Sequence, residues 1–174
     1  MRKIYRISIL TATLFAAASC NSNTNPQTNQ MHENHDSHTM KVNEQGDKVM
    51  GFSHEKTTHH FRLFADGGAI EVTANDAADA ESRDQIRKHL SHIAGMFAGG
   101  NFDAPVLTHG KTPPGASKMQ AMKDRISYKY EETERGGRVR ISTADKDALA
   151  AIYEFLRFQI SDHQTGDSTE VTKE

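Results

Sequence analysis

The sequence has one cysteine, no tryptophan and only four prolines among its 174 residues. A lone cysteine excludes a disulfide within the chain, so the stability of the fold must come from a packed core. No apolar stretch reaches the ~20 residues that a membrane-spanning helix needs. The charges nearly balance, with 21 Lys and Arg against 23 Asp and Glu. The sequence therefore has no basic patch of the kind that would indicate a nucleic-acid partner.

Several catalytic motifs are also missing. The sequence has no G-x-S-x-G and no GxGxxG, and Gly110-Lys111-Thr112 has Pro105 where a phosphate-binding loop needs its first glycine. His54 and His59 lie five residues apart, whereas the zinc-protease motif needs a spacing of four. No nucleotide or organic cofactor is indicated. We therefore favour a binding protein over an enzyme, and a metal-dependent hydrolase is the least favoured hypothesis.

What is present at the N-terminus has the layout of a secretory signal. Three basic residues precede an apolar run over residues 7–18, and small residues lead to Cys20. This arrangement resembles the lipobox of bacterial lipoproteins, with Ala17 where that box most often has Leu. The resemblance implies removal of the signal peptide (1–19) and lipidation of Cys20. The alternative is an ordinary secretory signal with an incidental cysteine.

A lipidated Cys20 implies a protein anchored in the bacterial cell envelope, facing the periplasm or the cell surface. Asn21 follows the cysteine, which in lipoproteins of this type favours the outer membrane. The next residues, 20–49, are polar and rich in Asn, His and Met, so we predict a disordered tether there. Periodic patterns begin near Met50, and residues 50–174 have the length of a single domain.

Two similar patterns follow one another in that domain. Each has two strands joined by a glycine-rich turn and then a helix, and the turns at Gly67-Gly68 and Gly136-Gly137 align. The four predicted strands span 57–64, 69–74, 125–133 and 138–143. The helices are expected over 78–98, after caps at Asn75-Asp76, and from Thr143 or Asp145 to Asp162. We predict an α+β fold, a two-layer ββα-ββα pseudo-repeat with a four-stranded, mainly antiparallel sheet and two helices on one face.

The helical phases also predict which faces are buried. Both helices carry an apolar stripe, formed by Ile86, Leu90, Ile93 and Phe97 in the first and by Leu149, Ile152, Tyr153, Leu156 and Ile160 in the second. Phe155 and Phe158 fall outside the second stripe. Two alternatives remain open for them: they are covered by the proline-containing loop predicted over 99–118, or they form a homodimer contact.

The tether carries the first candidate metal-binding set. Three imidazoles are spaced three residues apart and bracketed by two thioethers, in Met31, His32, His35, His38 and Met40. Imidazole suits copper, zinc and nickel, and thioether adds a preference for Cu(I). Solubility alone is an alternative reason for such a composition.

A second candidate lies in the predicted domain. His89, His92 and Met96 form one strip along the first helix, because their spacing is i, i+3 and i+7. His59 has the strand parity of residues that should face the helices, so it could approach this strip. We predict a metal site of His59, His89 and His92 with Met96 as a soft fourth ligand. The alternative is that these residues only pack in the core or lie on the surface. Met50 and His54 lie just upstream and could join either candidate site, because the sequence pattern does not fix their position.

Together these features predict a membrane-anchored envelope lipoprotein that binds a transition metal, with copper first and zinc second. Its role would be capture, buffering or hand-over of the ion. Because Cys20 is the only thiol and would carry lipid, any metal site must use imidazole, thioether and carboxylate groups. The alternative is a homodimeric interaction or scaffold lipoprotein in which the histidines are incidental.

Overall fold

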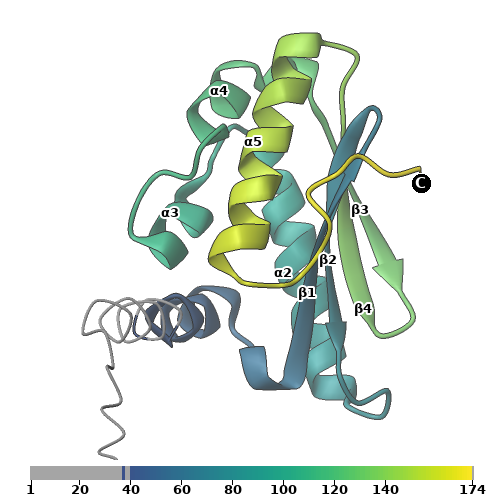
Figure 1. Ribbon diagram of the computed structural model, residues 1–174. Coiled ribbons are helices and arrows are strands. Elements are labelled where there is room, and N and C mark those ends of the chain that lie inside the picture. Colours follow the sequence, from purple (N-terminus) through teal and green to yellow (C-terminus); the bar gives the residue numbers. More distant parts are fainter. Residues whose placement is uncertain (1–36, 38–39, 174) are drawn as a thin grey trace, which may run out of the picture.

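The computed structural model describes residues 37 and 40–173. A four-stranded sheet of order β1-β2-β4-β3 forms one layer, and every neighbouring pair of strands is antiparallel (Figure 1). The strands are β1 (Thr57–Phe64), β2 (Gly67–Ala74), β3 (Ser127–Thr133) and β4 (Gly136–Ser142), and the short 3-10 helices η1 (His54–Lys56) and η2 (Lys123–Arg125) precede β1 and β3. The predicted α+β fold with two ββα units is confirmed.

Two long helices, α2 (Ala80–Ala98) and α5 (Lys146–Asp162), cover one face of the sheet (Figure 1). Asp145 caps α5, as predicted, by accepting hydrogen bonds from the first backbone N–H groups of the helix. The cap of α2 is Asp79, which accepts from the Ser82 N–H, rather than Asn75 or Asp76. Asp76 instead closes the preceding turn by accepting from the Ala78 N–H.

Each helix packs mainly over the strands of the other ββα unit. α2 lies over β3 and β4, and α5 lies over β1 and β2. The glycine pairs make this close approach possible, because a Cβ at Gly68 would collide with Leu156 of α5 and one at Gly136 would crowd Ile86 of α2. Because α5 packs over β1 and β2, its C-terminal end lies next to β1. The apolar stripes of the two helices do not predict this position.

Residues 99–118 are more ordered than the predicted loop. They contain α3 (Asp103–His109) and the beginning of α4 (Ala116–Ala121), which lie beside α5 on its side away from the sheet (Figure 1). Pro105 is compatible with α3 because it occupies the first turn, where a backbone N–H has no partner within the helix.

This segment covers the phenylalanines of α5. Phe155 is 1% exposed, and its ring packs edge-on against Phe97 and Phe102. Phe158 is half-buried and lies edge-on to His109 of α3. Of the two alternatives left open for Phe155, its packing against Phe102 favours cover by residues 99–118.

The chain before β1 also differs from its prediction. Residues 40–50 are helical, and Val42 is 2% exposed, so the predicted disorder does not extend over 40–49. Val42 and Val49 lie seven residues apart on one helical face, and Val49 is partly buried against the core. Apart from residue 37, the rest of the predicted tether, with Cys20, lies outside the described residues.

The C-terminal segment after α5 covers the outer edge of β1. The Thr172 N–H donates to the Leu63 carbonyl at 2.9 Å, and the Phe61 N–H donates to the Asp167 carboxylate at 2.9 Å. Backbone groups that an edge strand would otherwise leave open are thereby occupied. The segment begins at His163, which lies next to the same strand.

Candidate functional site

His59 lies on β1 with its side chain toward the helices, as its parity predicts. It lines a cavity of about 70 Å³ between the sheet and the helical layer, together with apolar side chains such as Phe61 and Leu90. The rings of Phe52 and Phe61 lie near the His59 ring, at centroid distances of 6.0 and 6.4 Å. The imidazole is thus presented to a mainly apolar space.

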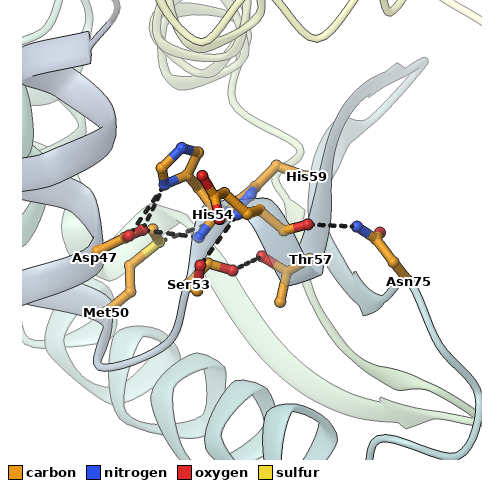
Figure 2. Close-up of polar contacts among 8 residues, drawn as sticks. Asp47, Met50, Ser53, His54, Thr57, His59 and Asn75 are labelled. Atoms are coloured by element: carbon orange, nitrogen blue, oxygen red, sulfur yellow. Dashed lines mark hydrogen bonds and ion pairs between the residues drawn. The ribbon is translucent and has the colours of Figure 1, made fainter.

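Met50 brings a thioether to this histidine. Its Sδ lies 3.2 Å from Nε2 of His59. Figure 2 shows Asp47, Met50, His54 and His59 gathered where the N-terminal helical segment meets β1. Met50 reaches this position because residues 40–50 form the helix described above, and its side chain lines the same cavity as His59.

His163 supplies a second imidazole. It is the C-cap residue of α5, and its backbone N–H donates to the Gln159 carbonyl. Its ring is nearly parallel to that of His59, with 5.8 Å between centroids. Met50, His59 and His163 all line both the inner cavity and a second pocket of about 210 Å³. We call these three residues the Met50/His59/His163 set.

The surroundings keep both imidazoles neutral at pH 7. Burial, reinforced by the neighbouring His89, lowers the pKa of His59 from its ordinary 6.5 to about 4. Burial and the nearby His59 lower the pKa of His163 to about 3. A neutral imidazole has a lone pair on one ring nitrogen, which is the form that binds a metal ion.

His89 also lines the inner cavity, and its ring lies edge-on to Phe52 at 5.6 Å. Burial and the adjacent His92 lower the pKa of His89 to about 4. His92 itself is exposed, and Met96 is partly buried against the core. Of the predicted set, only His59 and His89 line the cavity. Residues 40–173 contain no cluster of three or more His, Cys, Asp or Glu side chains arranged to hold a metal ion.

His109 is buried with both ring nitrogens engaged. Nδ1 lies 2.6 Å from a carboxylate oxygen of Asp162, and Nε2 lies 3.0 Å from Oε1 of Gln159. Its ring is edge-on to that of His163, with 5.0 Å between centroids. These contacts give His109 a packing role, in which it supports His163 from the side of α3.

Of the candidate metal-binding residues in the tether, the structure describes only Met40. Met40 is 60% exposed within the described helical segment. Met31, His32, His35 and His38 lie outside the described residues.

Sequence patterns missed His163 as a candidate. It follows the last turn of α5 and belongs to no periodic stripe, so its approach to His59 depends on the crossing of α5 over β1 and β2. Met50 could be named from the sequence, and the helix over residues 40–50 gives it a position. The observed donors are two neutral imidazoles and one thioether, a combination suited to a soft metal ion.

No protein-family model matches the chain, and no curated protein or solved structure shows significant similarity to it. Within the described residues, no helix has both the length and the apolar character required to cross a bilayer.

Proposed function

We propose that this protein is a bacterial envelope lipoprotein, anchored through Cys20, that binds one Cu(I) ion through Met50, His59 and His163. The observation that carries the proposal is the 3.2 Å approach of Met50 Sδ to His59 Nε2 beside a second neutral imidazole. Metal bonds of about 2.0 Å to nitrogen and 2.3 Å to sulfur together exceed this separation, so one ion can bond to both atoms.

The choice of Cu(I) follows from charge and softness. Thioether sulfur favours Cu(I) over harder ions. The three donors are uncharged, so a bound divalent ion would keep its full double charge at a mainly apolar site, whereas Cu(I) carries a single charge. Zinc remains the second candidate. The role we propose is capture, buffering or hand-over of copper, without covalent chemistry.

The test is an anaerobic Cu(I) titration of the full mature chain against a chromogenic chelator, with Cys20→Ser to remove the thiol. Met50→Leu keeps the volume of the side chain and removes the sulfur, and we expect at least about a tenfold loss of affinity, or 1.4 kcal/mol. Met96→Leu is the matched control, because Met96 is also a partly buried methionine of the same domain. X-ray absorption of the loaded protein should show one sulfur and two nitrogen neighbours.

Two outcomes would contradict the proposal. One is the absence of Cu(I) binding tighter than about 100 μM. The other is a Met50→Leu protein that binds Cu(I) as tightly as the Met96→Leu control.

The tether is tested separately with a His32/His35/His38→Gln triple variant. If these residues capture copper, the variant should lose additional weaker equivalents and keep the tight one. Mass spectrometry of the N-terminal peptide from the native envelope tests the lipid on Cys20.

A further inference from the structure

A third histidine lies in the pocket that the Met50/His59/His163 set also lines. His54 is the first residue of η1, and its side chain is 35% exposed. It lines the pocket of about 210 Å³ that Met50, His59 and His163 also line. This pocket is more polar than the inner cavity, since Thr57, Thr58 and Thr165 contribute to its wall.

Asp47 holds His54 at three points. One carboxylate oxygen accepts from the His54 backbone N–H at 2.8 Å, and ring Nδ1 lies 3.1 and 3.0 Å from the two oxygens. Figure 2 shows the Asp47 side chain directed at the imidazole. A carboxylate partner favours the tautomer in which Nδ1 carries the proton, and the lone pair is then on Nε2. Metal-binding histidines commonly have such a carboxylate partner.

Asp47 and Met50 are also three residues apart on one helix, so their side chains are neighbours on its surface. The residue that orients His54 and the residue that supplies the thioether therefore belong to the same turn. That turn belongs to the helical segment over residues 40–50, immediately after the proposed His/Met tether. His54 lines only the pocket of about 210 Å³, whereas His59 and His163 also line the inner cavity, so an ion that enters this pocket from solvent would meet His54 on its way to the inner imidazoles.

Two other histidines in the described residues, His60 and His109, also have carboxylate partners. Neither of them lines the pocket of about 210 Å³. His109 has both ring nitrogens engaged, as described above. His60 has Nδ1 2.9 Å from Asp167, yet its strand parity places it on the opposite face of β1 from His59, and it lines neither pocket.

We propose that His54, oriented by Asp47, is the loading ligand of the copper site. Its Nε2 binds Cu(I) first, and the ion then exchanges onto Met50, His59 and His163 across the 210 Å³ pocket. The transfer exchanges one neutral ligand for others and changes neither the oxidation state of copper nor the number of bound protons. This inference rests on the proposed function, because it needs Cu(I) as the ion.

The experiment measures the rate of Cu(I) uptake by stopped flow, using the full mature chain with Cys20→Ser and a Cu(I)–chelator complex as donor. His54→Gln and Asp47→Asn should each slow uptake by about tenfold. The equilibrium affinity should change less than about threefold. His60→Gln removes a carboxylate-paired imidazole outside the pocket, so it should load at the wild-type rate. Circular dichroism confirms that each variant is folded.

The outcomes separate the inference from the proposed function. Wild-type uptake that is equally fast in His54→Gln overturns the inference alone. A loss of affinity in proportion to the loss of rate also overturns it, because His54 would then be a permanent ligand. If the wild-type protein takes up no Cu(I), the proposed function fails, and the inference fails with it.

Discussion

The imidazole planes of His59 and His163 lie within 8° of parallel, although one residue belongs to β1 and the other follows α5. Both side chains are partly buried, in surroundings that oppose their protonation. The pair therefore connects the two ends of the domain through groups that must stay neutral.

This neutrality predicts that the metal-free protein loses stability in mild acid. The folded-state pKa values of His59, His89 and His163 are about 4, 4 and 3, below the ordinary 6.5 of the unfolded chain. Between pH 6.5 and the folded-state pKa values, the unfolded chain binds more protons than the folded chain. The free energy of unfolding is therefore highest above pH 6.5 and decreases as the pH is lowered. Each histidine contributes up to about 1.4 kcal/mol per pH unit.

Urea denaturation from pH 7.5 to 4.5 measures this dependence. His163→Phe should flatten it, whereas the exposed His92→Gln should leave it unchanged. An unfolding free energy that is constant between pH 6.5 and 5 in the wild-type protein would contradict the prediction.

Phe155→Ala should destabilise the protein by about 3–5 kcal/mol, because Phe155 fills the space between α5, Phe97 and Phe102. Phe158→Ala is the comparison, and its cost should be roughly 1–2 kcal/mol because the ring is only half-buried. Thermal or urea unfolding measures both. Equal effects of the two substitutions would mean that residues 99–118 do not cover Phe155 in solution.

Two glycine substitutions should have opposite signs. Gly115 has φ +79°, and an added Cβ would collide with the Ala151 carbonyl of α5, so Gly115→Ala should cost roughly 1–3 kcal/mol. Gly95 lies within α2, and an added Cβ there meets no atom within 4 Å. Gly95→Ala should therefore stabilise the protein by about 0.5–1 kcal/mol. A stabilising Gly115→Ala would show that α4 packs differently against α5.

Asp167→Ala should loosen the C-terminal segment from β1. The carboxylate accepts from the Phe61 N–H, and it also lies 2.9 Å from Nδ1 of His60. The loss should cost about 1–3 kcal/mol and speed amide hydrogen exchange at Phe61. Asp84→Ala, an exposed carboxylate on α2, is the control. Unchanged exchange at Phe61 would be inconsistent with this contact.

The sheet and the two long helices were predictable because their signals are local. Strand alternation, glycine turns and apolar stripes each need fewer than ~20 residues of sequence. Prolines obscured the helical start of α3, although Pro105 occupies a position that a helix tolerates. Polar composition likewise obscured the helix over residues 40–50, whose buried side is marked by Val42 and Val49.

The candidate site was predictable only in part. The parity of β1 correctly directed His59 toward the helices. His163 joined it because α5 crosses onto the strands of the other ββα unit, and that crossing depends on long-range packing at Gly68 and Leu156. His92 lies on the same strip of α2 as His89, but His92 is exposed whereas His89 is partly buried. Helical spacing alone cannot show which residues of such a strip lie beyond the edge of the core.

Met50, His59 and His163 belong to three segments that no disulfide can join. An ion held by them would tie the N-terminal helical segment and the chain after α5 to the outer strand of the sheet. It would act as a removable cross-link that closes a loop over most of the domain. Copper loading would then be detectable as resistance to proteolysis at both ends of the domain at once.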